Sequence, residues 1–415
     1  MRKKEVIIVG GGIIGLATAY YLNLEGHDVS VIDQDKIKSG ASHINSGYLT
    51  PSHIIPLAAP GMISKGFRWM FNNSSPFYIK PRFDLDLVNW GMKFIKSCTS
   101  EHVQKSMKSI LDINLLSKKL FIEMQQSNAF DFHLESKGLL MAYKTSVAER
   151  EEAKAASWAK DLGIIVKQLS KEEILKIQPK VPMEVAGAFM YESDAHTTPE
   201  LFMNNLKNHL MSRGVKFFLD TAVSSFQKKE KKIETLNTNK GIFKADEFVI
   251  ATGAWTEGIL KELGIKLSIQ AGKGYSFDVQ DITGLSIPAI LSEAKVAVTP
   301  MSGYTRFGGT MEISGINSKI NSRRVLSIVN AAKEYYPGIV IPNTSVDKAR
   351  SGLRPLSADG LPFIGRHSSF KNLVLASGHA MMGWSLGPAT GKLITELISG
   401  YDPSLDLKPY SPERT

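Results

Sequence analysis

The chain has 415 residues, 43% of them hydrophobic, and a formal net charge of +10. This length exceeds what one hydrophobic core usually holds, so we expect two domains. The single cysteine, Cys98, excludes an intramolecular disulfide and a cysteine zinc cluster, so we predict no metal site and a reducing, cytoplasmic compartment. The basic charge fits an anionic partner, but no basic recognition motif is present, which argues against nucleic acid.

Residues 6–22 form a nearly continuous apolar run. Four glycines interrupt it: Gly10, Gly11, Gly12 and Gly15. Successive glycines disfavour a membrane-spanning helix, and no other segment is long and apolar enough to span a bilayer. The helical apolar pattern also continues through Tyr20 and Tyr21, past the small residues where a signal peptide would be cleaved. We therefore interpret the run as the start of a nucleotide-binding domain.

The same stretch has the order of a dinucleotide-binding unit. Its predicted parts are a buried strand over 5–9, the turn Gly10-x-Gly12-x-x-Gly15, a helix over 13–25 closed by Gly26, and a strand over 29–33. The glycines allow a tight turn and a close approach of pyrophosphate, and the helix N-terminus at Ile13 and Ile14 offers free N–H groups. Asp33 lies 18 residues after Gly15, where a carboxylate accepts hydrogen bonds from an adenosine ribose.

Hydrophobic periodicity predicts the elements of the rest of the chain. After a long loop over 34–61, helices are expected within 83–127 and at 148–163, 169–179, 199–213, 323–336 and 387–398. Two strands are expected within 131–143 and a strand pair within 215–227, with single strands at 248–252, 275–279, 295–300, 304–310 and 371–378. Ser170 and Glu173 have the spacing of a helix capping box. The run Lys228-Lys229-Glu230-Lys231-Lys232 is expected to be a solvated hairpin, or else a contact with an anionic membrane surface.

Strands that run into glycine recur near 245–253 and 372–378, so the nucleotide fold is not confined to the N-terminus. We predict an α/β fold with a doubly wound Rossmann-type domain built from residues 1–80, 190–261 and 346–415. A mixed-sheet substrate domain is predicted to be inserted twice, over residues 81–189 and 262–345.

Several motifs have the order and spacing that are typical of one known family. They are the N-terminal glycine turn, Ala251-Thr252-Gly253, Gly352-Leu353-Arg354-Pro355, Asp359-Gly360, Pro362-Phe363-Ile364-Gly365, and the segment from Gly378-His379 to Gly383 and Gly387. With them the chain resembles the D-amino acid oxidase superfamily of FAD-dependent oxidoreductases. Within it, Asn45-Ser46-Gly47, PLAAPGM with the nearby RWMF, GKGYSF, RFGGTMEISG and GHAMMGWSLG are similar to the small subunit of bacterial D-amino acid dehydrogenases.

The resemblance implies a reaction. Such enzymes move a hydride from Cα of a D-amino acid to N5 of FAD, giving an imino acid that water hydrolyses to a 2-oxo acid and ammonia, with electrons passed to a quinone or another respiratory carrier. A secondary amino acid substrate (D-proline, D-hydroxyproline, glycine or sarcosine), a non-catalytic flavoprotein subunit and an NAD-linked enzyme stay open as alternatives. His43 lies one position off the site of covalent flavin attachment in some relatives, so non-covalent FAD is expected.

The resemblance also implies site residues. Arg354 is the candidate for the substrate carboxylate, because a guanidinium matches a carboxylate with two hydrogen bonds. Arg306 is the second candidate, and the structural alternative for Arg354 is an ion pair with Asp359. His379 and Tyr275 complete the predicted catalytic set, with Tyr48 and His53 as further pocket residues or packing residues. No catalytic base is identified. The predicted FAD-binding residues are Gly10, Gly12, Ile13, Ile14, Gly15, Asp33, Ser42, Asn45, Gly47, Val223, Thr252, Gly253, Gly378, Gly383 and Gly387.

Overall fold

The computed structural model describes residues 2–62, 75–280 and 283–414. The RWMF stretch at 68–71 therefore lies outside the described residues. A six-stranded sheet carries the N-terminal motif, in the order β10 (Lys216–Phe218), β2 (Asp28–Ile32), β1 (Glu5–Val9), β14 (Glu247–Ile250), β21 (Leu373–Ser377) and β20 (Phe363–Arg366). Neighbouring strands pair in parallel except β20, which runs antiparallel to β21. The chain order reverses between β1 and β14, and ligands bind at such a switch point, beyond the carboxyl ends of the strands.

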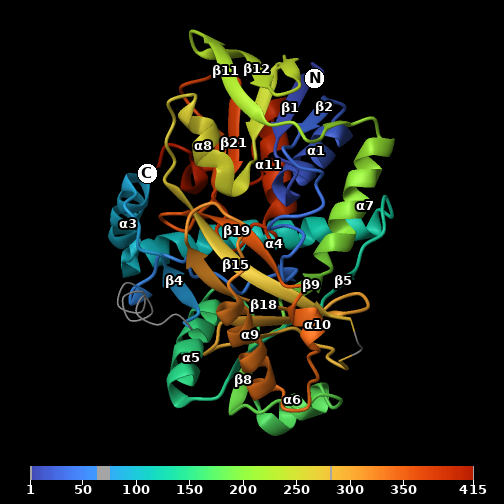
Figure 1. Cartoon of the computed structure of the whole chain (residues 1–415), viewed down its shortest axis with the longest axis vertical. Coiled ribbons are helices and arrows are strands. Elements are labelled where there is room, and N and C mark those ends of the chain that lie inside the picture. The colour runs from blue at the N-terminus through green and yellow to red at the C-terminus, as the bar shows by residue number, and fades with distance from the viewer. Residues whose placement is uncertain (1, 63–74, 281–282, 415) are drawn as a thin grey trace.

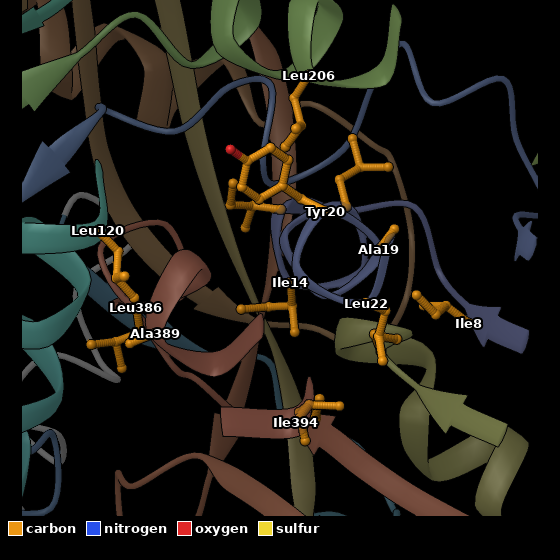
Figure 2. Packing of buried hydrophobic residues seen from close by; sticks show 14 of the residues in the cluster. Ile8, Ile14, Ala19, Tyr20, Leu22, Leu120, Leu206, Leu386, Ala389 and Ile394 are labelled. Carbon is orange, nitrogen blue, oxygen red and sulfur yellow. The ribbon is translucent and has the colours of Figure 1, made fainter. Parts of the chain in front are cut away.

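Both faces of this sheet are buried, because successive residues of a strand point to opposite faces. Val6 and Ile8 of β1 enter one core with side chains of α1 (Ile13–Leu24), α4 (Ser100–Gln126), α7 (Pro199–Ser212) and α11 (Gly387–Ser399). Ile7 and Val9 enter the opposite core with α8 (Thr256–Lys261) and a small sheet of β11 (Val223–Lys229), β12 (Lys232–Thr238) and β13 (Gly241–Phe243). Figure 2 shows the first core, where labelled side chains of these helices converge, among them Ile14, Leu120, Leu206 and Ile394.

A nine-stranded sheet forms the second body of the molecule. Its order is β19 (Arg350–Ser357), β15 (Ile269–Val279), β18 (Thr305–Ile313), β17 (Val296–Pro300), β16 (Ala289–Leu291), β6 (Leu139–Tyr143), β8 (Gly187–Tyr191) and β7 (Val166–Ser170), with β4 (Phe77–Ile79) beside β18. The pairs β16–β6 and β4–β18 are parallel and the others antiparallel. Helix α9 (Ser322–Tyr335) packs on one core of this sheet and α5 (Ser146–Asp161) on another.

Shorter elements complete the described chain. A three-stranded sheet joins β3 (Tyr48–Leu49), β9 (Ala195–Thr197) and β5 (Leu134–Glu135). The remaining helices are α3 (Leu85–Ser97), α6 (Lys171–Ile177) and α10 (Asn343–Val346), with 3-10 turns at Gly253–Trp255 and Lys408–Tyr410. Figure 1 shows β1, β2 and β21 of the six-stranded sheet in the upper half, and β15, β18, β9 and β5 below them.

The predicted fold class is confirmed: a doubly wound parallel sheet stands beside a larger mixed sheet. The predicted helices and strands are present within a few residues, and Ser170 and Glu173 form the expected capping box. The two strands predicted within 215–227 exist but do not pair with each other, since β10 joins β2 and β11 joins β12. Asp220, with φ of 49°, lies between the two strands, where the chain leaves the parallel sheet.

The division into two domains stays a prediction. All strands of the six-stranded sheet fall within the three segments predicted for the nucleotide domain. However, β4 and β19 also fall within those segments, and they pair into the nine-stranded sheet. Near residues 80 and 346, the segments predicted for the nucleotide domain therefore each contribute one strand to the nine-stranded sheet.

The basic run at 228–232 forms the predicted hairpin. It connects β11 to β12 through Glu230, whose φ is 51°, and its five side chains are exposed. Within the parts of the chain that the structure describes, no helix is long and apolar enough to cross a membrane.

Helices α1 and α11 touch at Gly391. A Cβ atom there would lie 2.5 Å from the carbonyl carbon of Ala17, which no packed carbon atom tolerates. We expect Gly391→Ala to lower the free energy of unfolding by about 1–3 kcal/mol, measured by urea unfolding, because the helices must separate. The matched control is Gly258→Ala in α8, where a Cβ meets nothing within 4 Å. Equal effects of the two substitutions would refute this account of the helix contact.

Candidate active site

One large cavity joins the two bodies of the molecule. Its volume is about 1550 Å³, enough for a dinucleotide together with a small substrate. The glycine turn lines one end through Gly10, Gly12, Ile13 and Ile14. Strands β15, β18 and β19 of the mixed sheet line another part through Tyr275, Thr310 and Arg354. The predicted nucleotide site and the predicted substrate site are thus parts of a single space.

The glycine turn has the close contacts that its sequence predicts. A Cβ atom on Gly10 would lie 2.4 Å from the Ala251 carbonyl oxygen, and one on Gly15 would lie 1.8 Å from the Gly10 carbonyl oxygen. Gly15 therefore acts in helix–strand packing and is not among the residues that line the cavity. The carboxylate of Asp33 accepts hydrogen bonds from the backbone N–H groups of Gly11 (2.6 Å) and Asp35 (2.8 Å). Burial raises the pKa of Asp33, and these two hydrogen bonds oppose the rise.

The loop after β2 folds back over the glycine turn. The Ser42 hydroxyl accepts a hydrogen bond from the Ile13 N–H at 3.0 Å, so the expectation of a free N–H group at Ile13 was wrong. The Asn45 side chain accepts a hydrogen bond from the Gly47 N–H at 2.9 Å. Gly47 adopts φ of 75°, and a Cβ there would lie 2.2 Å from the Thr197 carbonyl oxygen. Ser42 and Asn45 line the cavity, whereas Gly47 lies behind it and lets the loop approach β9.

Arg306 of β18 fixes this loop and does not line the cavity. Its guanidinium donates to both carboxylate oxygens of Asp278, at 2.8 and 3.0 Å, and to the carbonyls of His43 (2.7 Å) and Asn45 (2.9 Å). The side chain is 0% exposed. The guanidinium donates its hydrogen bonds to groups of the protein itself, so Arg306 has a structural role. The sequence hypothesis that Arg306 binds substrate therefore finds no support.

The segment before α11 lies along the cavity. Gly383 lines it together with Met382, Trp384 and Ser385, just before the N-terminus of α11. Gly378 and Gly387 do not line it: Gly378 has φ of 75° and lies against Phe363, and Gly387 lies against Ile13 of α1. The N–H groups of Gly387 and Ala389 are bonded within the protein, to the Trp384 carbonyl and the Ser117 hydroxyl. Only the dipole of α11 therefore favours negative charge in this part of the cavity.

His379 lines the cavity but is only 1% exposed. Its Nε2 lies 3.0 Å from the Thr390 hydroxyl in α11, and burial lowers its pKa to about 3. The imidazole is therefore neutral at pH 7 and linked to α11. Three other predicted residues, Val223, Thr252 and Gly253, line the cavity at the carboxyl end of β14 and the start of β11.

Arg354 differs from Arg306 in its hydrogen-bond partners, although each arginine lies on a strand that flanks β15. Its Nη1 donates to the Thr310 carbonyl at 3.0 Å, and no carboxylate within the described residues pairs with it. The alternative partner, Asp359, pairs instead with Arg414 at 2.7 and 3.0 Å. Burial lowers the pKa of Arg354 to about 10, so the guanidinium remains a cation at pH 7 and lacks a counterion.

The backbone around Arg354 is specialised. Thr310 adopts φ of 60°, which is strained for a β-branched residue. It lies at a register shift between β15 and β18, and its carbonyl faces Arg354. On β15, a Cβ on Gly274 would lie 2.2 Å from Nη1 of Arg354, so only glycine leaves room for the guanidinium. Sequence reasoning missed both positions, although GKGYSF and RFGGT lie in the quoted motifs.

Tyr275 lines the cavity beside this arginine and is bound to a second charged group. Its hydroxyl donates to Glu312 at 2.9 Å, and Glu312 also lies 3.3 Å from Arg324 and 3.6 Å from Lys273. Burial and the hydrogen bond to Glu312 raise the pKa of Tyr275. The phenol is thus protonated at neutral pH and donates its proton to Glu312, so Tyr275 is not available as a base.

The loop at 48–54 forms another wall. Tyr48 donates to the carbonyls of Ala289 (2.8 Å) and Val298 (3.0 Å), and burial lowers the pKa of His53 to about 4. The loop is held by Asp194, which is 0% exposed and accepts hydrogen bonds from the Ser52 N–H (3.1 Å) and hydroxyl (2.5 Å). No sequence pattern pointed to Asp194.

Nearly the whole chain is similar to one protein family and to several of its curated relatives. Residues 5–397 match the sequence model of a family described as FAD dependent oxidoreductases. A D-amino acid dehydrogenase of Granulibacter bethesdensis is 29% identical over 411 residues, or 97% of each chain. Another from Bradyrhizobium diazoefficiens is 28% identical over 419 residues, covering 99% of this chain and 98% of that one.

Two solved structures have a similar fold. Glycine oxidase from Geobacillus kaustophilus aligns over 100% of both chains with a TM-score of 0.78 and 23% identity. L-proline dehydrogenase from P. horikoshii aligns over 100% of this chain and 98% of that one, with a TM-score of 0.75 and 20% identity. At these identities the comparison concerns the fold alone.

Asp194 generates a pH-dependent prediction. Burial raises its pKa from 3.8 to about 7, so between these values the folded state binds a proton that the unfolded state has released. This group therefore lowers the free energy of unfolding as pH rises through that window, by up to about 1.4 kcal/mol per pH unit. Asp194→Asn lacks this contribution. We therefore expect its free energy of unfolding, measured by chemical unfolding, to rise relative to that of the parent protein from pH 4 to pH 7. The exposed Asp402→Asn serves as control. Parallel pH curves for the parent and Asp194→Asn would contradict the prediction.

Proposed function

Because the chain belongs to the family of FAD dependent oxidoreductases, we propose that it oxidises D-amino acids at Cα, giving an imino acid that water hydrolyses to a 2-oxo acid and ammonia. The observation that carries the substrate assignment is Arg354, a cation without a carboxylate partner in the cavity that the glycine turn also lines. The D-amino acid class is supported by the names of relatives that are 28–29% identical over nearly the whole chain.

Arg354 would hold the substrate carboxylate. A desolvated guanidinium gains most from an anion that offers two acceptor oxygens in one plane. Thr310 uses only one of its donors, which leaves the rest of the fork for substrate. The guanidinium packs against the backbone of Gly274, where a Cβ atom would lie 2.2 Å from Nη1, so the glycine fixes its position. Charge and shape therefore favour a free α-carboxylate over an amide or an ester.

The residues of the cavity fit FAD. When bound, FAD supplies the acceptor for the hydride that leaves Cα. The turn from Gly10 to Gly15 would face the pyrophosphate, Asp33 the ribose, and the segment before α11 the flavin ring. His43 is 2% exposed and does not line the cavity, which supports non-covalent binding.

The protein's other task is to orient the substrate and to leave its amine neutral. Tyr275 directs its proton to Glu312, and His379 is linked to Thr390, so neither side chain offers a free base to the amine. We therefore infer that the two residues shape the pocket and that the amine reaches it already deprotonated. Burial keeps both groups uncharged at neutral pH, which avoids repelling or trapping the amine.

The proposal includes an acceptor other than oxygen. We infer a quinone or another respiratory carrier, because the relatives are named dehydrogenases. The net charge of +10 and the exposed hairpin at 228–232 would suit a peripheral contact with an anionic membrane surface. The second candidate function is oxidation of a secondary amino acid or glycine, which would need the same carboxylate partner.

The direct test mixes the FAD-loaded enzyme anaerobically with D- and L-amino acids, glycine, sarcosine and D-proline, and follows the flavin absorbance. We expect D-amino acids to bleach the flavin much faster than L-amino acids, and a quinone to restore the colour faster than air. Bleaching only by glycine, sarcosine or D-proline would favour the second candidate function. No bleaching by any compound would contradict both and favour a non-catalytic flavoprotein subunit.

Arg354→Ala should raise KM for the best substrate by about 10- to 100-fold, since a hydrogen bond to a charged group contributes about 1.5–3 kcal/mol. The FAD content should not change, because Arg354 lies apart from the glycine turn in the sheet order. Arg354→Lys keeps the charge without the fork and should recover part of the loss. The exposed Arg323→Ala is the control. An unchanged KM in Arg354→Ala would remove this arginine from the carboxylate role.

Gly274→Ala provides a companion test. Its methyl group would occupy space now 2.2 Å from Nη1 of Arg354 and displace the guanidinium. It should therefore raise KM in the parent enzyme but add little in the Arg354→Ala background, because the two changes act through one interaction. Additive effects in steady-state kinetics would mean that Gly274 acts on something other than Arg354.

A further inference from the structure

We propose that His133, Glu135 and His196 form a binding site for a divalent first-row transition-metal cation. The three residues come from β5, the residue before it, and the neighbouring β9. No cysteine motif and no closely spaced pair of histidines in the sequence indicates this site. The proposal differs from the sequence prediction of no metal site. It concerns a region behind the cavity and does not rest on the proposed reaction.

The three side chains converge on one point. One ligand atom from each lies within 4.8 Å of the other two. Nε2 of His133 lies 3.6 Å from Oε1 of Glu135, and Nε2 of His196 lies 3.5 Å from Oε2 of the same carboxylate. Ligand atoms around a tetrahedral ion with bonds near 2.1 Å lie roughly 3.4 Å apart. The existing separations therefore accept a cation after small side-chain movements.

His196 is the independent observation that points to a ligand. It is 0% exposed, and neither ring nitrogen makes a hydrogen bond of ordinary geometry within the described residues. Its polar neighbours are the Glu135 carboxylate, His133 and the Pro300 carbonyl. Buried polar side chains are normally satisfied, and one that is not requires an explanation such as an ion. A cation bound to Nε2, with Nδ1 turned to the Pro300 carbonyl, would satisfy both nitrogens.

His133 is oriented as a ligand would be. Its Nδ1 lies 2.9 Å from the Thr198 hydroxyl oxygen, which also accepts the Ser302 N–H at 2.8 Å. If this oxygen accepts from Nδ1 as well, the proton is on Nδ1 and the lone pair of Nε2 faces Glu135. Metal-binding histidines usually have such an outer partner on the second nitrogen.

Lys137 competes with the cation for the same carboxylate. Its Nζ lies 2.9 Å from Glu135, and the side chains of Lys137 and Glu135 are 47% and 35% exposed. A cation would have to share or displace this ion pair. Removing the lysine charge should therefore increase metal affinity, an effect that a purely structural His–Glu cluster would not produce.

The ligand set selects the class of ion. Two imidazoles and one carboxylate suit Zn²⁺, Co²⁺ or Ni²⁺, whereas Mg²⁺ and Ca²⁺ prefer oxygen ligands alone. Glu135 and His133 are partly exposed, which leaves room for a water ligand. The next residue, Thr197, donates its N–H to the Gly47 carbonyl at 2.8 Å. A bound cation would therefore brace β5 and β9 beneath the loop that carries Asn45.

The test uses the full-length, FAD-loaded protein after chelator treatment. Zn²⁺ is titrated by calorimetry, bound metal is counted after dialysis, and thermal unfolding is followed by flavin release. We expect one equivalent of Zn²⁺ and a rise in unfolding temperature. Glu135→Gln, at a partly exposed position that should fold, and His196→Asn should each weaken binding at least about tenfold. Lys137→Met should strengthen it, and His367→Asn, distant in sequence and sheet, should leave it unchanged.

Several outcomes would overturn the proposal. The absence of a stoichiometric binding event is one. Another is binding that Glu135→Gln does not weaken, or that His367→Asn weakens equally, since either would indicate adventitious surface binding. A Lys137→Met variant with lower affinity would show that the carboxylate does not hold the ion. Substrate turnover plays no part in these measurements, so failure here leaves the proposed reaction untouched.

Discussion

The site depends on a contrast between two arginines on the strands that flank β15. Arg306 is neutralised by Asp278 and donates to two carbonyls of the loop at 43–45, so it ties the nucleotide body to the mixed sheet. Among the described residues, Arg354 donates only to the Thr310 carbonyl, and it lines the cavity. Arg354 is only partly exposed to solvent, so an anionic ligand that supplies the missing counterion stabilises its charge. Arg306 thus has a structural role, and Arg354 is available to bind an anion.

The nucleotide half of the fold was predictable because its signals are local. The glycine turn, the apolar strands and Asp33 follow one another within residues 5–33, and the structure arranges them as expected. The FAD cofactor and the resemblance are confirmed by the family match over residues 5–397. The NAD alternative, which the glycine turn alone left open, falls with that match. Registers between distant strands, such as β19 beside β15, carry no comparable local signal.

Parts of the site escaped sequence reasoning for the same reason. Gly274 matters because Arg354 lies across it from another strand, and Thr310 matters because a register shift turns its carbonyl inward. Asp194 and Ser52 meet through the fold, 142 positions apart in sequence. His133 and His196 likewise come together only when β5 pairs with β9. The sequence motifs identified Arg354, but only the packing of the strands explains why its guanidinium is available to bind a carboxylate.

The most direct measurement is a crystal structure of the FAD-loaded enzyme with an unreactive carboxylate such as benzoate. We expect both carboxylate oxygens within about 3 Å of the Arg354 guanidinium, with the pyrophosphate of FAD at the turn from Gly10 to Gly15. Arg306 should keep its bonds to Asp278. A carboxylate bound to another cation of the cavity, such as Arg350 or Lys295, with Arg354 still bonded only to Thr310, would contradict the central claim.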